Sequence, residues 1–198
     1  MKKILRVLSP ALLLIGLVGT AYAATYKEAL QTFHAAIESG SFFANSYGYA
    51  IFPNVGSGAV GIGVASGSGR VYTGGHWVGY ANMKQISVGP QIGGKSYSEI
   101  VFFEDKRSFE EFISGKFEFG ADASVTAITA GANADAGTDG VSKGSSEGPR
   151  DASTKGRYNS GFAVFVVQKG GLMAGASVAG EKFTYESREQ HAKAAEAE

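Results

Sequence analysis

The first hydrophobic pattern beyond the extreme N-terminus is that of an amphipathic helix. In ATYKEALQTFHAAIESG (24–40), large apolar residues recur at helical spacing on one face, namely Tyr26, Leu30, Phe33 and Ile37. Thr25 and Glu28 fit a capping box, and Gly40 would end the helix. An isolated helix of this length is marginal in water, so the apolar face is expected to dock on the rest of the domain or on a membrane.

After this helix, short apolar and alternating runs predict strands. The runs lie at 49–52, 59–65, 70–74, 84–94, 96–103, 157–168, 171–179 and 182–186. Pro53 and Asn54 are expected to end the first strand, and 66–69 to form a hairpin turn. Asp105 should cap a short helix at 105–114. The fold class is therefore α+β, with a curved, mostly antiparallel sheet that could close into a barrel, an N-terminal amphipathic helix and this short helix.

Three segments complete the predicted organisation. Residues 117–136 alternate with period two and slip phase once, which favours a strand with a bulge, although their alanines leave a helix open. Residues 137–156 hold Val141 as their one large apolar side chain and read as a mobile loop. Residues 187–198 form a polar tail. The folded domain is thus expected to span 24–186.

The first 23 residues have the pattern of a secretory signal peptide. Lys2, Lys3 and Arg6 precede a short apolar run, and 21–23 reads Ala-Tyr-Ala, a cleavage motif. An uncleaved membrane anchor is the alternative. The chain holds no cysteine, so it lacks both the lipid-attachment residue of lipoproteins and any disulfide. The protein is therefore expected in the periplasm or outside the cell.

Composition excludes several function classes. Removing residues 1–23 leaves a net charge of −3, whereas a nucleic-acid binder would carry a clustered basic excess. Glycine accounts for 29 of the 198 residues without a collagen period, which fits closely packed strands. His34, His76 and His191 show no metal-ligand spacing, so neither a metal nor another cofactor is expected.

Gly56, Gly58 and Gly61 match the dinucleotide fingerprint G-x-G-x-x-G by letter alone. That fingerprint needs a helix to begin at the glycine turn, and the residues that follow favour a strand. The serine-elbow match at 140–144 falls in the predicted loop, away from any strand-to-helix turn. No catalytic constellation emerges, and the protein is expected not to be an enzyme. A hydrolase survives as a third hypothesis only because His76 adjoins Trp77.

An interfacial signal remains. Trp77, the one tryptophan, lies in a glycine-rich turn, and tryptophan favours membrane interfaces. Basic residues flank it in sequence, and each would attract an anionic bilayer by roughly 1 kcal/mol. The candidate lipid-binding residues are therefore Tyr26, Leu30, Phe33, Arg70, Trp77, Lys84 and Lys95. The alternative is structural, with Trp77 as a lid over the core and the helix packed on the sheet.

Four stretches carry a resemblance to a known family. They are YAIFPNVGSGAVGIGVASGSGRVY (49–72), QISVGPQIGGKSYSEIVFFED (85–105), FISGKFEFGADASVTA (112–127) and GFAVFVVQKGGLMAGASVAGEKFTY (161–185). In this order they resemble the SYLF domain, the Ysc84-type lipid- and actin-binding domain, and in particular its bacterial exported single-domain members. The chain departs from the pattern at Ser57, where members often carry a basic residue.

The resemblance implies a non-enzymatic lipid-binding module. In this chain it would bind phospholipid or another amphiphile at a membrane surface of the bacterial envelope. A protein-interaction or scaffold domain of the envelope is the alternative, suggested by the loop at 137–156 and the polar tail.

Overall fold

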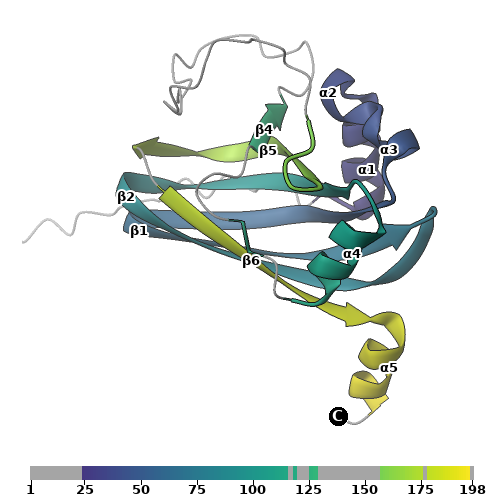
Figure 1. The fold of residues 1–198 in the computed structure, drawn as a ribbon. Helices are drawn as coiled ribbons and strands as arrows, with labels where there is room; N and C mark the ends of the chain where they lie inside the picture. The colour runs from purple at the N-terminus through teal and green to yellow at the C-terminus, as the bar shows by residue number, and fades with distance from the viewer. Residues whose placement is uncertain (1–23, 116–117, 120–124, 129–156, 176–177, 197–198) are drawn as a thin grey trace, which may run out of the picture.

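The computed structural model describes residues 24–115, 118–119, 125–128, 157–175 and 178–196 (Figure 1). The helices are α1 (Tyr26–Ala35), α2 (Ile37–Gly40), α3 (Phe42–Asn45), α4 (Lys106–Ile113) and α5 (Arg188–Glu196). The strands are β1 (Gly48–Thr73), β2 (His76–Phe103), β3 (Glu118–Phe119), β4 (Val125–Ile128), β5 (Phe162–Gly175) and β6 (Val178–Ser187). All strand pairs are antiparallel except β4 with β5, so the α+β prediction is confirmed.

Strand β2 takes part in two layers of the folded sheet, one that contains β6 and one that contains β5. On one edge it pairs with β1 along nearly its whole length. On the other edge, its residues 79–88 pair with β6 and its residues 91–103 pair with β5. The sheet order is β3-β6-β2-β5-β4, with different strands at its two ends, so the sheet is curved but open and does not close into a barrel.

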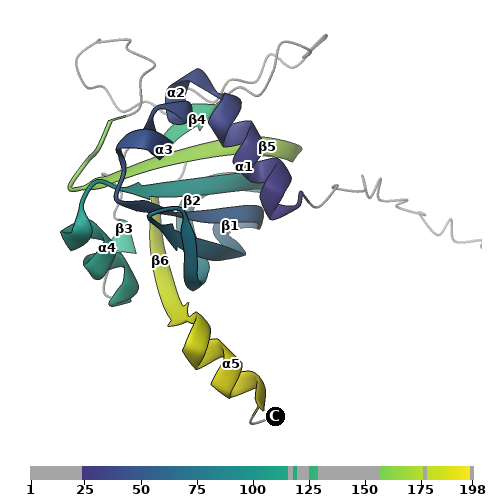
Figure 2. The same cartoon turned by 90° about the vertical axis from the view of Figure 1, so that its right-hand side faces the viewer.

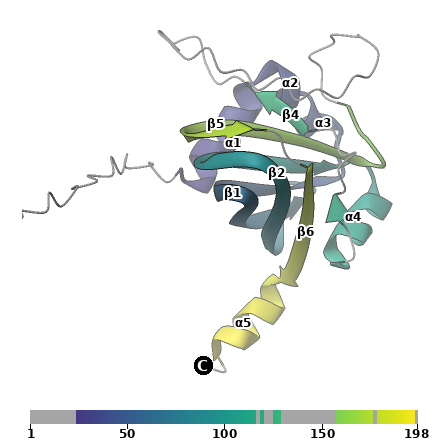
Figure 3. The same ribbon diagram turned by 90° about the vertical axis from the view of Figure 1, so that its left-hand side faces the viewer.

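The two layers meet where the β1–β2 hairpin bends (Figure 3). Gly61 has φ +73°, a left-handed conformation that glycine adopts at little cost, and the β1–β2 register shifts between Val60 and Ile62. On β2, residues 89–91 have no register partner in β1, which is where Pro90 is tolerated. The hairpin folds back far enough for Tyr72, near its turn, to stack on Tyr49, near its open end, at 5.0 Å.

The hairpin turn lies later in the chain than the sequence suggests. Gly74 and Gly75, with φ +55° and +78°, connect β1 to β2, as a two-residue hairpin turn requires. The expected turn at 66–69 is wrong, because these residues continue β1. Pro53 does not end a strand either, since it lies inside β1 at a register shift.

Apolar side chains form two clusters, one on each face of what we call the helix-covered layer (β1 before the bend, β2 after it, and β5). Between this layer and the uncovered layer (β1 after the bend, β2 before it, and β6) lie Phe52, Val55, Met83, Val101, Phe103, Phe112 and Phe183, among others. On the opposite face, Phe33 and Phe42 pack on Ile100, Phe102 and Phe165. Helices α1 to α3 lie together on that face, whereas α4 lies at a different edge (Figure 2).

The helix predictions are confirmed apart from one boundary. Thr25 and Glu28 form the expected capping box of α1, and Asp105 caps α4 together with Ser108. The expected end of the first helix at Gly40 is wrong, because α1 ends at Ala35 and Ala36 has an extended backbone. The short turn α2 follows and leaves Ile37 90% exposed.

The remaining predictions concern segments that the structure describes only in part. Residues 118–119 and 125–128 are strands, as favoured for 117–136, and the rest of that segment lies outside the described residues. The predicted signal peptide at 1–23 and the predicted loop at 137–156 also lie outside the described residues. The polar tail is the helix α5, of which no residue is buried.

Candidate functional site

Six large apolar side chains are exposed to solvent around the bend. Val60, Ile62, Val64, Ile86, Val88 and Ile92 are each 61–79% exposed. They form three directly opposed pairs on the β1–β2 ladder, Val60 with Ile92, Ile62 with Val88 and Val64 with Ile86. We call this set the ridge. A contiguous exposed apolar surface on a folded protein marks an interaction site far more strongly than scattered apolar residues do.

The ridge faces outward because the interior of the bend has no room for large side chains. Ala59 and Ala65 point inward and are buried. A Cβ atom on Gly63 would lie 2.4 Å from Ser87 Oγ, and that oxygen accepts a 2.8 Å hydrogen bond from Gln91 Nε2. Small and polar residues therefore fill the inside, while β-branched residues line the outside. In an ordinary half-buried strand the large apolar residues face the interior, so the arrangement here is reversed.

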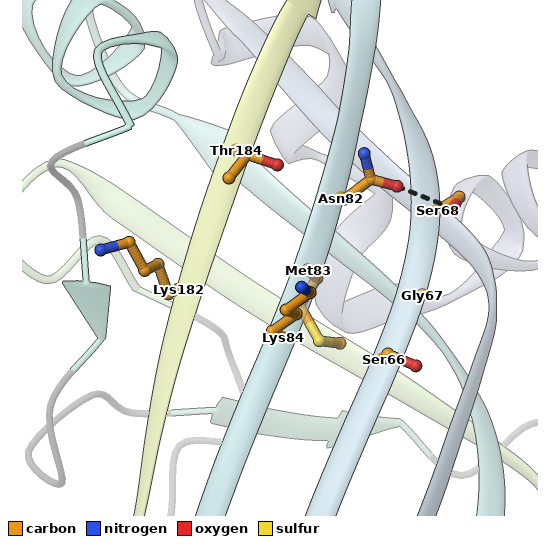
Figure 4. Close-up of a pocket in the computed structure, with 8 residues that line it drawn as sticks. All are labelled: Ser66, Gly67, Ser68, Asn82, Met83, Lys84, Lys182 and Thr184. Atoms are coloured by element: carbon orange, nitrogen blue, oxygen red, sulfur yellow. Dashed lines mark hydrogen bonds between the residues drawn. The ribbon is translucent and has the colours of Figure 1, made fainter.

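Polar rows follow the ridge along the outward face of the uncovered layer. In the next row, Lys84 lies opposite Ser66 of β1 and opposite Lys182 of β6. In the row after that, Asn82 lies between Ser68 and Thr184, and Ser68 Oγ donates a 2.8 Å hydrogen bond to Asn82 Oδ1 (Figure 4). These rows line a shallow hollow of about 520 Å³. Apolar surface thus gives way to amine, amide and hydroxyl groups within two rows.

A second cluster lies near the hairpin turn and combines three of the residues predicted from sequence. The Arg70 guanidinium lies 4.2 Å from the ring centroid of Tyr26 and 4.3 Å from that of Trp77. Arg188 of α5 lies 4.6 Å from the Trp77 ring. Burial raises the pKa of Tyr26, although the positive charge of Arg70 opposes that shift. Cation–π contacts of this kind tie α1 and α5 to the hairpin.

Trp77 is anchored in this cluster. Its Nε1 donates a 2.8 Å hydrogen bond to Gly79 O, and the indole is partly buried. Arg70 Nε is buried without a hydrogen-bond partner. The structural alternative for Trp77 therefore fits its contacts well, because its polar N–H is already satisfied within the protein.

The other predicted residues lie elsewhere. Phe33 is fully buried and Leu30 is partly buried in the cluster under α1, so these side chains hold the helix on the sheet. Lys84 belongs to the polar row beside the ridge, and Lys95 lies 5.6 Å from the ring centroid of Tyr97. The structure therefore does not bring the seven residues into one site.

The ridge itself was missed by the sequence analysis. Its signal is the alternation of small and β-branched residues in AVGIGV (59–64) and the matching ISV at 86–88. Such alternation reads as a half-buried strand, and it does not say which of the two sets faces the interior.

The three histidines that the sequence analysis considered all lie among the described residues. Among the described residues, no group of three or more His, Asp or Glu side chains could hold a metal ion. His34 stacks on Phe43, His191 contacts Glu186 at 3.0 Å, and His76 is exposed at the start of β2, next to the turn. Gly56, Gly58 and Gly61 lie within β1, so no helix begins at the fingerprint, as expected.

None of the helices that the structure describes is long and apolar enough to cross a bilayer.

Comparison with known proteins gives the family. Beta cell expansion factor A from Aeromonas veronii is 27% identical over 146 residues, which cover 71% of this chain and 46% of that protein. The chain thus spans about half the length of this relative. No solved structure matches the chain. Residues 84–193 match the family described as "Ysc84: Las17-binding protein actin regulator", and the chain therefore belongs to the Ysc84 family, whose domain is also called SYLF.

Proposed function

We propose that this protein is a non-enzymatic lipid-binding module of the bacterial envelope and that it binds phospholipid or another amphiphile through the ridge. The family is lipid- and actin-binding in general. The observation that carries the proposal is the set of three opposed apolar pairs on the outside of the bend. The signal-like pattern of residues 1–23 supports an exported compartment.

The energetics of the ridge suit a lipid surface. Fully burying one Val or Ile side chain is worth roughly 1.5–3 kcal/mol, so six partly inserted side chains can offset the cost of association. The two paired strands hold the side chains in place, so little conformational entropy is lost on binding. Neither half of the ridge could fold inward to avoid water, because the interior of the bend is closely packed at Gly63.

The position of Lys84 supports one orientation of the protein on the bilayer. Lys84 follows the Val64–Ile86 pair by one outward-facing row, about 7 Å along the strand. With the ridge in the acyl region, its ammonium group reaches the depth of the phosphates and contributes roughly 1 kcal/mol on anionic lipid. Arg70 is six residues beyond Val64, about 20 Å away, and so stays outside the bilayer when the strands stand upright.

Vesicle co-sedimentation tests the proposal. Replacing one opposed pair, in the variant Ile62→Ser with Val88→Ser, should weaken binding to phosphatidylglycerol-containing vesicles by on the order of 30-fold, because two apolar anchors are lost. Ile37→Ser is the matched control, since Ile37 is 90% exposed but lies on α2, away from the ridge. It should bind like the wild type. Equal binding by all three proteins, or none by the wild type, would contradict the proposal.

The emission of Trp77 gives an independent check on the orientation. We expect vesicles to leave its wavelength maximum unchanged, because the indole is held between Arg70 and Arg188 and lies nine residues along β2 from Ile86, about 30 Å from the ridge. A blue shift of several nanometres on wild-type protein that is already bound would instead place the turn end, with Tyr26, Arg70 and Trp77, at the membrane.

One observation favours a scaffold role as the second candidate. Helix α5 extends from the end of β6, and each of its residues is exposed even though Arg188 and His191 contact the hairpin (Figures 1 and 2). A helix of this kind could present a polar face to an envelope protein. Deleting residues 189–198 and comparing cross-linked partners would test this role, and unchanged partners would remove it.

A further inference from the structure

Two glutamates are buried in the core between the two layers. Glu99 of β2 belongs to the helix-covered layer and is 2% exposed, while Glu181 of β6 belongs to the uncovered layer and is 5% exposed. The two carboxyl groups lie within hydrogen-bonding reach of each other, and each affects the titration of the other. A carboxyl–carboxyl hydrogen bond needs a proton on one of the two groups. A pair that shares one proton would therefore join the two layers.

The surroundings give this pair no cationic partner within the part of the chain that the structure describes. Tyr97, two residues from Glu99 on β2, is the one other titratable group in electrostatic contact with both carboxyls. Phe52 of β1 and Val166 of β5 are the register partners of Glu99. The Oε1 atom of each glutamate is buried without a hydrogen-bond partner.

Burial accounts for the titration of the pair. Desolvation and the neighbouring Glu181 raise the pKa of Glu99 well above its ordinary value. Desolvation raises the pKa of Glu181 to about 7. When the shared proton is lost, two negative charges remain within hydrogen-bond distance inside an apolar core, which is strongly unfavourable. The layers must then separate locally or admit water.

Strand β6 is the element best placed to respond. Along one edge it pairs with β2, and its other edge pairs with only the two residues of β3 in the described chain. Glu181 lies opposite Gln85, and the preceding residue, Gly180, lies opposite Ile86 of the ridge. A displacement of β6 at Glu181 therefore acts on the part of β2 that carries Ile86 and Val88 of the ridge.

We propose that Glu99 and Glu181 form a proton-dependent latch. While the two carboxyl groups share a proton, the latch holds β6 on the core. When the proton leaves, β6 is released and no longer supports the part of β2 beneath the ridge. The latch goes beyond lipid binding, and it would stand even if the ridge bound another ligand. It predicts that the folded protein is most stable at mildly acidic pH and that its stability falls as the pH rises.

Denaturant unfolding across pH tests the latch. Because the native pKa values are raised above the unfolded value of 4.5, the native state holds more protons between pH 4.5 and 7, and stability falls as pH rises through this window. For Glu181 alone, the unfolding equilibrium constant should increase on the order of 100-fold between pH 5 and pH 9. The double variant Glu99→Gln with Glu181→Gln should change by no more than about threefold.

Glu104→Gln is the matched control, because Glu104 is exposed at the end of β2, and it should keep the wild-type profile. A flat wild-type profile, or a double variant with the wild-type slope, would overturn the latch. If the double variant does not fold, Glu181→Gln alone should reduce the slope of the profile between pH 5 and 7, because one of the two carboxyl groups with a raised pKa no longer titrates, and an unchanged slope there would overturn the proposal equally.

Hydrogen exchange tests where the opening occurs. After correction for intrinsic rates, amides of residues 178–187 in the wild type should exchange at least about tenfold faster at pH 8.5 than at pH 6, while those of α1 should not. The double variant should show no such difference. Uniform acceleration over the whole chain, or none in β6, would contradict a local release of that strand.

Discussion

Phe102→Ala is expected to lower the free energy of unfolding by about 3–5 kcal/mol, the range for removing a fully buried phenylalanine. Phe102 is fully buried on the face of β2 beneath helices α1 to α3. Its ring contacts four other aromatic rings, Phe42, Phe43, Tyr49 and Phe165, at centroid distances of 4.9–5.9 Å. The cavity would lie between a hydrogen-bonded sheet and packed helices, where neighbouring groups can collapse only in part.

Urea unfolding followed by far-UV circular dichroism measures this loss, with Ile37→Ala as the control. Ile37 is 90% exposed on α2, so its truncation should change stability by no more than about 0.5 kcal/mol. A similar stability of the two variants would show that the aromatic cluster does not hold the helices on the sheet.

Gly171→Ala is expected to cost about 2–6 kcal/mol, from backbone strain and a steric clash together. Gly171 has φ +90°, a conformation unfavourable for alanine. Its added Cβ would lie 2.2 Å from Gly94 O, a backbone atom that cannot move without disturbing the β2–β5 ladder. Backbone strain and the steric clash both destabilise the variant, so a local shift that relieves one of them would still leave the other.

The control for this prediction is Gly58→Ala in β1. A Cβ on Gly58 would meet no atom within 4 Å, and its backbone is not left-handed. The substitution should therefore be neutral or slightly stabilising, because it restricts the unfolded chain. Thermal unfolding of both variants gives the comparison, and equal midpoints would refute the close approach of β5 to β2 at Gly94.

Local rules explain what could be predicted from the sequence. Thr25 with Glu28, and Asp105 with the apolar face after it, predict α1 and α4 because capping and helical periodicity act within a few residues. The α+β class follows from the same periodicities. The resemblance to the SYLF domain agreed with the family match over residues 84–193.

Glycine was the main source of error in the strands. The same residue type permits a turn, a bend or a close approach, and sequence alone does not separate these uses. Gly67 and Gly69 looked like a turn, yet a Cβ on Gly69 would lie 2.6 Å from Ile51 O, so this glycine lets β1 fold against itself. The true turn at Gly74 and Gly75 lay a few residues further on.

The site depended on long-range packing and was predicted only in part. Tyr26, Arg70 and Trp77 came together because the folded hairpin brings its turn toward α1. The ridge could not be assigned, since nothing local determines that Gly63 rather than Ile62 faces inward. The paired glutamates are 82 positions apart and meet only across the two layers.

The membership of β2 in both layers has a consequence for how the nascent chain matures. The hairpin of β1 and β2 is synthesised early, but its second edge waits for β5 and β6, more than fifty residues later. Until those strands arrive, an apolar edge is open to mispairing, and the many non-local contacts make folding slow. The protein should therefore fold as one cooperative event after synthesis, and a chain that stops before residue 162 should aggregate.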